Sequence, residues 1–128
     1  MLPEKANGGT AYLPIMPISL QFKGKTIATN ALLDSGSTVN VLPYSVGITL
    51  GLDWESQQVP VPLTGNLKSV EAFGVVVAGI VEDCAPTNLA FAWAKTDQIP
   101  MILGQNNFFQ AFNICFFRGQ LVFDVSER

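Results

Sequence analysis

The sequence predicts a single all-β domain with one or two short helices, whose strands form a closed barrel or a sandwich. The chain has 128 residues, which suits one domain with a sizeable core. Hydrophobic residues make up 48% of it and charged residues only 13%, about half of the usual share of roughly 25%, which excludes a disordered chain. Short strand-like segments separated by turn residues occupy most of its length.

The N-terminal part is expected to contain a flexible segment followed by the first strand. Residues 1–10 are interpreted as the flexible segment and residues 11–128 as the folded domain. Residues 12–22 alternate between apolar and polar, as a strand does, but Pro14 and Pro17 lack the N–H that a central strand needs. We therefore expect the first half of this strand to be an edge or terminal strand.

The next elements are a hairpin and a strand that leads into a helix. Residues 23–25, Lys-Gly-Lys, predict a turn, and residues 26–33 predict the strand that returns from it. Residues 40–42 predict a short strand. Residues 43–50 predict a short helix, with Pro43 near its first turn, where a helix tolerates proline.

The middle of the chain predicts a second hairpin and two further strands. Residues 59–63 and 72–81 are strand-like and flank residues 64–69, which are typical of a hairpin tip. Residues 89–93 and 101–103 predict the two strands that follow.

The C-terminal part predicts a helix and a final hairpin. Residues 105–112 form the helix candidate, because Asn106 or Asn107 can cap its first turn. Residues 114–117 and 121–125 predict the two strands of the hairpin.

The distribution of charge excludes several classes of function. The net charge is −3 and the seven Lys and Arg residues are scattered, which argues against nucleic acid as a partner. The chain contains no His, which excludes a Ser-His-Asp hydrolase and a His-ligated zinc site. Acid–base chemistry must therefore come from carboxylates, Lys, Tyr or Cys. The low charge also fits a surface partly covered by another chain, although a compact all-β domain could be equally charge-poor.

The two cysteines and the longest apolar run suggest where the protein resides. Cys84 and Cys115 allow one disulfide at most, and their spacing does not favour a metal site, so we expect two buried free thiols. The run at residues 74–81 is far shorter than the roughly 20 residues that span a bilayer. The start of the chain does not resemble a signal peptide. We expect a soluble, cytoplasmic protein with no membrane segment.

The strongest chemical signal is the run Leu-Leu-Asp-Ser-Gly-Ser-Thr-Val at residues 32–39. Apolar residues on both sides would hold the Asp34 carboxylate rigidly at a tight turn. Gly36 has no Cβ, so the backbone and a ligand can approach closely there. The hydroxyl of Ser35 can brace the turn. An ordinary Asx turn between two strands explains the same residues without any function.

A second motif lies downstream at residues 101–109, Met-Ile-Leu-Gly-Gln-Asn-Asn-Phe-Phe, where an apolar pair and a glycine precede the predicted helix. Residues 31–36 and 100–104 both lead from an apolar strand into a glycine turn, which two similar half-domains or chance would explain. The order and spacing of the two motifs resemble retroviral-type (retropepsin-like) aspartic proteases, in particular the cellular, single-domain kind. The resemblance covers about residues 10–125.

The resemblance implies a role for each matching residue. Asp34 matches the catalytic aspartate, and Ser35 matches a hydroxyl that hydrogen-bonds across a dimer beneath the active site. Gly36 matches the residue whose carbonyl accepts a hydrogen bond from bound peptide. The predicted hairpin tip is similar to the substrate-covering flap by location only, and a plain hairpin is the alternative there. The residues of this tip that are matched to the flap are Thr64, Gly65, Asn66 and Leu67.

The chemistry that the resemblance implies requires two carboxylates. One acts as general base on a water while the other, protonated, polarises the scissile carbonyl. Only Asp34 lies in a suitable Asp-Ser-Gly triplet, so the second carboxylate is expected from a second chain in a two-fold homodimer. The expected function is an aspartic endopeptidase that acts on extended peptides with apolar side chains, without metal or cofactor. The alternative is a catalytically silent binding or dimerisation module of the same fold.

Two positions depart from the viral members of the family. An acid–arginine ion pair of those enzymes is replaced here by Thr38 and Gln105, which suggests a neutral hydrogen bond instead. Ser37 occupies a place where the viral enzymes usually carry alanine. We hypothesise that its hydroxyl stabilises ionised Asp34, in which case Ser37→Ala would raise the pH of optimal activity.

Overall fold

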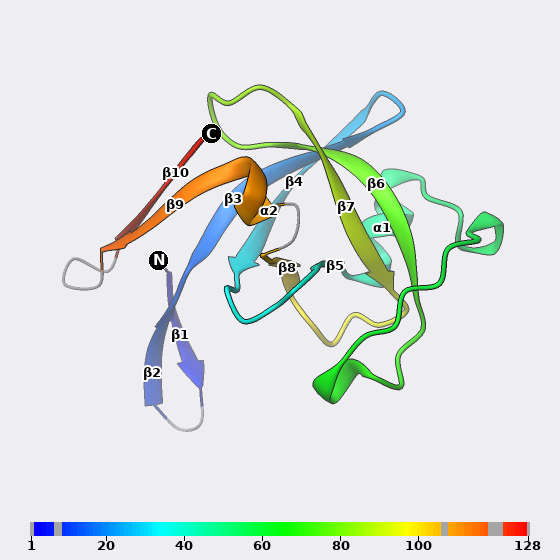
Figure 1. Ribbon diagram of the computed structural model, residues 1–128, viewed down its shortest axis with the longest axis horizontal. Coiled ribbons are helices and arrows are strands. Elements are labelled where there is room, and N and C mark those ends of the chain that lie inside the picture. Colours follow the sequence, from blue (N-terminus) through cyan, green and yellow to red (C-terminus); the bar gives the residue numbers. More distant parts are fainter. Residues whose placement is uncertain (1, 7–8, 106–107, 118–121, 128) are drawn as a thin grey trace.

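The computed structural model describes residues 2–6, 9–105, 108–117 and 122–127, with side chains described for 14–105, Phe108 and Gln110. It confirms the all-β prediction, because six strands close into a barrel (Figure 1). Two short helices, α1 (Tyr44–Leu50) and α2 (Phe108–Ala111), connect strands. The strands of the barrel, in the order in which they pair, are β3 (Ile15–Phe22), β4 (Lys25–Leu33), β8 (Met101–Leu103), β5 (Asn40–Leu42), β7 (Thr87–Ala94) and β6 (Ala72–Ile80).

The first barrel hairpin joins β3 to β4 through the predicted turn. Phe22 pairs with Lys25, and the two residues between them, Lys23 and Gly24, have φ of 47° and 82°. Two positive φ values in succession are typical of the hairpin turns that match the twist of the strands. Only the second half of β3, from Ser19, also pairs with β6. The prediction that its first half is an edge is therefore confirmed.

An N-terminal hairpin was not predicted. The segment 1–10, expected to be flexible, contains β1 (Leu2–Ala6) and the start of β2 (Gly9–Leu13), which pair antiparallel. Ala6 pairs with Gly9, so two residues of sequence Asn-Gly separate the strands. Asn-Gly is the strongest short signal for a hairpin, and it explains why the chain reverses here.

Residues 31–36 and 100–104, the two segments that lead from an apolar strand into a glycine turn, lie next to each other. β4 and β8 pair in parallel, with Leu33 opposite Leu103. β5 pairs in parallel with β7 and contacts β8 through Val41 and Ile102. Because β4 and β8 run in the same direction, their carboxyl ends meet at one edge of the barrel, next to the start of β5.

The C-terminal helix is shorter than predicted. α2 begins at Phe108, whereas the sequence predicts a helix over residues 105–112, and its proposed caps at 106 and 107 lie outside the described residues. The final hairpin is confirmed with slightly longer strands, β9 (Phe112–Phe117) and β10 (Val122–Glu127). In Figure 1, this hairpin and the β1–β2 hairpin both lie on the left of the barrel.

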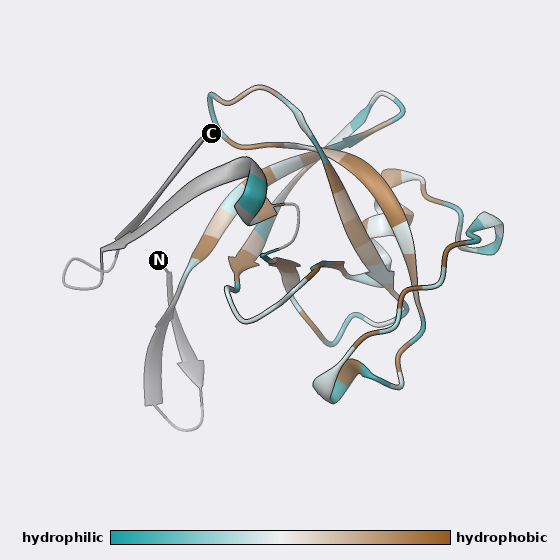
Figure 2. Ribbon diagram, viewed as in Figure 1, coloured by the Kyte–Doolittle hydropathy of each residue, from teal (hydrophilic) through white to brown (hydrophobic). Residues whose placement is uncertain are grey.

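The largest buried side chains fill the barrel between the strands and α1. Many residues of β6 and β7 are hydrophobic (Figure 2), and several of them belong to this core. Trp93 of β7 is completely buried and stacks on Tyr44 of α1 at 5.7 Å between ring centroids. Trp54 packs edge-on against Trp93 at 5.0 Å and against Phe73 of β6 at 4.8 Å. Aromatic pairs at these distances stabilise beyond their buried area, so this cluster fixes α1 against the sheet.

Gly47→Ala should destabilise the fold strongly. A Cβ at position 47 of α1 would lie 2.2 Å from Nε1 of Trp93, whose indole N–H donates to the Tyr44 carbonyl at 3.1 Å. Alanine ordinarily favours a helix by about 1 kcal/mol over glycine, but overpacking a core costs about 1–3 kcal/mol or more. We expect a net loss of about 2 kcal/mol or more in the free energy of unfolding.

Denaturant unfolding of Gly47→Ala, with and without Trp93→Phe, measures this effect. The smaller ring of Trp93→Phe leaves room for the new methyl group, so Gly47→Ala should cost less in that background. An equal cost in both backgrounds would show that the clash with the indole is not the cause.

The predicted central hairpin is only partly formed. Residues 59–63 are not a strand. They share one bridge with β6, between Pro60 and Phe73, and the Gly74 N–H donates to the Val59 carbonyl at 2.7 Å. The Val61 N–H donates to the Ala72 carbonyl at 2.9 Å, and the pairing of this segment with β6 is confined to these contacts. A short 3₁₀ helix, Gly65–Leu67, takes the place of a tight hairpin tip. We call residues 57–71 the flap segment.

Two smaller expectations concern cysteine and membranes. Cys84 is a free thiol that packs against the core, but it is half-buried rather than buried. The side chain of Cys115 lies outside the described residues. Within the described ranges, the structure contains no helix that is long and apolar enough to cross a membrane.

Candidate active site

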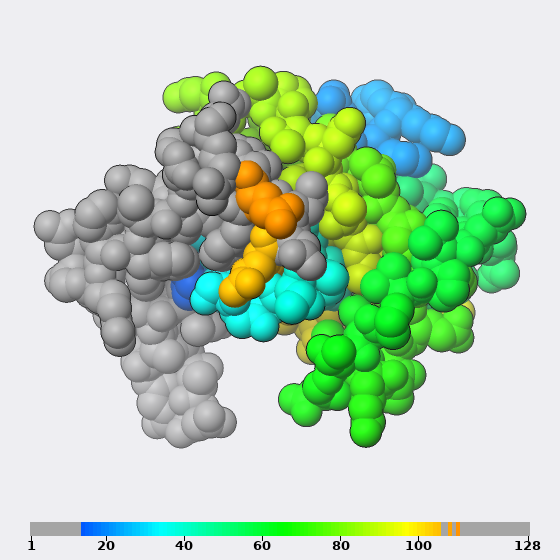
Figure 3. Space-filling model, viewed as in Figure 1, coloured from blue at the N-terminus to red at the C-terminus, as the bar shows by residue number. Residues whose placement is uncertain are grey.

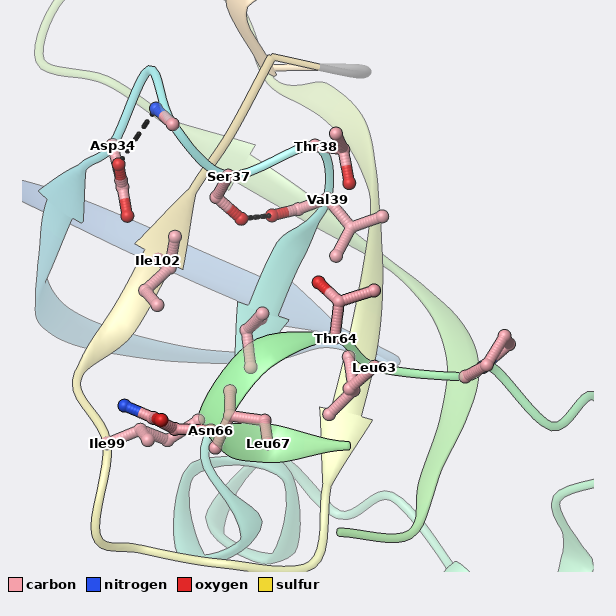
Figure 4. Close-up of a pocket in the computed structure, with 13 residues that line it drawn as sticks. Asp34, Ser37, Thr38, Val39, Leu63, Thr64, Asn66, Leu67, Ile99 and Ile102 are labelled. Atoms are coloured by element: carbon pink, nitrogen blue, oxygen red, sulfur yellow. Dashed lines mark hydrogen bonds between the residues drawn. The ribbon is translucent and has the colours of Figure 1, made fainter. Parts of the chain in front are cut away.

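Asp34 lies at the end of β4, where the chain leaves the barrel. Its N–H donates to the Leu103 carbonyl at 3.0 Å, which continues the pairing of β4 with β8. Its carboxylate Oδ1 accepts a hydrogen bond from the Gly36 N–H at 2.9 Å (Figure 4). Its carbonyl accepts one from the Ser37 N–H at 3.1 Å. The residues form the Asx turn that the sequence allowed, and this turn fixes the direction of the carboxylate.

The end of β8 supports the turn from the other side. The Gly104 N–H donates to Oδ1 of Asn40 at 2.8 Å, and the Asn40 side chain in turn donates to the Ala90 carbonyl of β7 at 2.9 Å. Asn40 is 1% exposed, and both the oxygen and the nitrogen of its side-chain amide are hydrogen-bonded, as a buried polar side chain requires. The Gln105 N–H donates to the Ser37 carbonyl at 2.9 Å. The active-site loop, residues 34–39, is therefore held between β8 and β5.

The hydroxyl of Ser37 does not bond to Asp34. Its Oγ donates to the Val39 carbonyl at 2.7 Å, within the same loop (Figure 4). A hydroxyl has a single proton to donate, so it is committed to Val39. This corrects the hypothesis that Ser37 stabilises ionised Asp34 directly, because the loop turns its hydroxyl back toward its own backbone.

A pocket of about 380 Å³ opens beside Asp34. Figure 3 shows the active-site loop in cyan and the flap segment in green, with the surface hollowed between them. Among the described residues that line the pocket, Asp34 alone can carry a charge. The lining residues come from the active-site loop, β5, the flap segment and β8 with the segment before it: Asp34, Gly36, Ser37, Thr38, Val39, Val41, Pro62, Leu63, Thr64, Asn66, Leu67, Ile99 and Ile102.

Apolar and polar groups line the pocket in about equal measure. Val41 and Leu63 are buried and belong to a small second core cluster, against which Leu67, Ile99 and Ile102 pack. The apolar side of the pocket is therefore part of a packed core cluster, and the pocket is not a loose surface depression. A concave site that combines packed apolar side chains with fixed polar groups is typical of ligand-binding pockets.

The structure brings most of the predicted site residues together. Asp34, Gly36 and Ser37 line the pocket on one side, and Thr64, Asn66 and Leu67 lie across it from Asp34 (Figure 4). Ser35 is exposed and Gly65 begins the 3₁₀ helix of the flap segment; neither lines the pocket.

The sequence did not identify the apolar residues that line the pocket, such as Val41 and Ile102. Val41 and Ile102 were assigned to strands, but not to a site, and they meet because β5 pairs with β8. A three-residue strand is too short for the alternation of apolar and polar residues to show which face of the sheet each residue occupies. The sequence therefore does not indicate that these residues line a pocket.

A neutral hydrogen bond was expected where Thr38 and Gln105 replace the acid–arginine ion pair of the viral enzymes. Gln105 does make one, but with another acceptor. The side-chain amide of Gln105 donates to the Ser35 carbonyl rather than to Thr38. Thr38 is exposed and lines the pocket. Among the described residues, no cluster of three or more Asp, Glu or Cys side chains is arranged to hold a metal ion.

The chain has the fold of the retropepsin-like aspartic proteases, with its Asp-Ser-Gly turn beside the pocket. The structure is similar to the crystal structure of a retropepsin-like aspartic protease from Rickettsia conorii, with a TM-score of 0.64. The two chains share 12% sequence identity, and the match covers 87% of this chain and 79% of the other. The model of the aspartyl protease family matches residues 18–107, so the chain belongs to that family. No curated protein sequence matches the chain.

Proposed function

We propose that the protein is an aspartic endopeptidase that hydrolyses peptide bonds with a water activated between the Asp34 carboxylates of a two-fold homodimer. The observation that carries this proposal is the Asp34 carboxylate, the one ionisable side chain among the described lining residues, which a backbone hydrogen bond fixes beside a packed apolar cluster in the pocket. The family and the fold support it. We assign the peptidase to residues 11–128.

The proposed chemistry needs no group other than the two carboxylates. The ionised carboxylate takes a proton from the water as its oxygen attacks the scissile carbonyl carbon. The protonated carboxylic acid donates its proton to the carbonyl oxygen, giving a neutral tetrahedral diol. Collapse of the diol breaks the C–N bond. As the carbonyl re-forms, one diol hydroxyl returns its proton to the carboxylate that had acted as acid, and the leaving nitrogen receives a proton from the carboxyl group that had acted as base. The pair ends with one proton, as it began.

The second carboxylate is proposed to come from a second copy of the chain. Other aspartates serve local structure: Asp53 accepts a hydrogen bond from the Glu55 N–H at 3.2 Å, and Asp97 accepts one from the Ser45 N–H at 2.8 Å. Neither lines the pocket. The exposed side chain of Ser35, next to Asp34, suits the cross-dimer hydrogen bond that the family resemblance implies.

The substrate is proposed to bind as an extended strand between the active-site loop and the flap segment. Its backbone would donate to the carbonyl of Gly36, and its apolar side chains would occupy the pocket. Thr64, Gly65, Asn66 and Leu67 would cover it. Because the lining residues other than Asp34 are uncharged, we expect the preferred side chains beside the cleaved bond to be apolar.

Cleavage of a peptide library between pH 3 and 7, by the wild type and by Asp34→Asn, tests the proposed function. We expect cleavage by the wild type only, at sites flanked by apolar residues. Asparagine has nearly the same shape as aspartate but cannot act as a base, so the fold should persist. Peptide binding by both proteins without cleavage would contradict the proposal and support a binding module.

Ser37→Ala should leave the pH of optimal activity unchanged. The hydroxyl donates to the Val39 carbonyl, so its removal costs a loop hydrogen bond worth about 1 kcal/mol of stability rather than a contact to Asp34. Paired pH–rate profiles and thermal unfolding of both proteins measure this. An optimum displaced to higher pH would restore the original hypothesis of a direct contact.

A further inference from the structure

Gln105 contacts the active-site loop at two carbonyl groups. Its backbone N–H donates to the Ser37 carbonyl at 2.9 Å, and its side-chain Nε2 donates to the Ser35 carbonyl. The residue itself is exposed and does not line the pocket. The Gln105 side chain therefore neither packs in the core nor reaches a peptide bound in the pocket.

The peptide group between Ser35 and Gly36 links Gln105 to Asp34. The oxygen of this peptide group accepts the hydrogen bond from the Gln105 side chain. Its N–H, which points in the opposite direction, donates to Oδ1 of Asp34 at 2.9 Å. A peptide group is planar, so holding its oxygen also fixes the direction of its N–H. Successive hydrogen bonds also polarise and strengthen one another.

We propose that Gln105 is a positioning residue that orients the Asp34 carboxylate through the Ser35–Gly36 peptide group. The inference rests on the proposed function, since it names a residue that acts on the same site. The amide of Gln105 is uncharged, so it holds the loop without placing a positive charge beside the carboxylate pair. A Gln105 amide that only stabilised the loop would affect folding, whereas a positioning residue affects the rate of the chemical step.

Gln105→Met removes the donor while keeping a side chain of similar length. We expect kcat to fall by about 10- to 100-fold with KM within about two-fold, because a misdirected carboxylate weakens the transition state more than substrate binding. The thermal midpoint should stay close to that of the wild type, because Gln105 is exposed. Unchanged kcat, or a loss explained by a smaller folded fraction, would overturn the inference.

Gln105→Glu provides a signature in the pH profile that a structural role would not give. A carboxylic acid in this place can donate to the Ser35 carbonyl only when it is protonated, which for a glutamate happens near a pKa of about 4.3. The activity of Gln105→Glu relative to wild type should therefore rise as the pH falls through this range. The same ratio for Gln105→Met should remain flat. Flat ratios for both variants would overturn the inference.

The NMR signal of the Gly36 amide proton reports on its hydrogen bond to the Asp34 carboxylate, and this measurement needs no substrate. In the wild type the Gly36 N–H donates to a carboxylate, and we expect its proton signal to move upfield in Gln105→Met as that bond lengthens. An unchanged signal would overturn the inference even if the protein is a peptidase. Absence of Asp34-dependent cleavage by the wild type would instead overturn the proposed function, while the Gly36 signal still tests the contact.

Discussion

Asp34→Asn subunits should inactivate wild-type subunits when the two are refolded together. Each proposed active site needs one carboxylate from each copy, so a mixed pair has only one. With random pairing, activity per wild-type subunit should fall to about one half in an equal mixture and to about one tenth at a nine-fold excess of the variant. The pure variant should retain less than about one thousandth of the wild-type kcat/KM, because the general base is lost.

Peptide cleavage at a fixed wild-type concentration measures this effect. Asp83→Asn is the matched control, since it makes the same chemical change at an exposed turn that does not line the pocket. Mixtures with Asp83→Asn should gain activity in proportion to the added subunits. Constant activity per wild-type subunit in the presence of Asp34→Asn would contradict a site shared between two copies.

The parts of the fold that the sequence predicts well are those with local signals. The Lys-Gly-Lys turn joins β3 to β4 as expected, because turn chemistry depends on adjacent residues. The strand predicted over residues 12–22 is instead broken at Pro14 into β2 and β3. The position of Asp34 after an apolar strand is also a local pattern. The N-terminal hairpin could have been predicted in the same way from its Asn-Gly pair.

The parts that were not predicted depend on contacts between distant segments. Val41 and Ile102 line the pocket because β5 and β8 pair, although they lie 61 positions apart in the sequence (102 − 41). The acceptor of the Gln105 side chain depends in the same way on where β8 ends relative to the active-site loop. Local propensity does not report pairing between strands, so these residues become visible only in the folded chain.

Gly104→Ala should damage both stability and activity. A Cβ at position 104 would lie 2.5 Å from the Val39 carbonyl oxygen and 2.7 Å from the Ser37 carbonyl oxygen. Both are backbone atoms of the active-site loop, and neither can rotate away as the end of a flexible side chain can. Either the loop or the end of β8 must therefore move to admit the methyl group.

Any such movement breaks hydrogen bonds that hold the loop. The Gly104 N–H donates to buried Asn40, and the next N–H, that of Gln105, donates to the Ser37 carbonyl. Overpacking costs about 1–3 kcal/mol, and leaving a buried amide oxygen unsatisfied costs about as much again. We expect the free energy of unfolding to fall by about 2–4 kcal/mol and kcat/KM to fall by at least about 100-fold in the fraction that remains folded.

Gly74→Ala is the matched control for this substitution. Position 74 lies in β6, and a Cβ there would have its closest contact at 3.4 Å, with a side-chain methyl of Val61. That distance is ordinary packing, so stability and activity should stay close to wild type. Denaturant unfolding and steady-state cleavage by both variants separate the two cases. If Gly104→Ala behaves like Gly74→Ala, the active-site loop does not depend on the close approach of β8, and the geometry proposed for Asp34 loses its support.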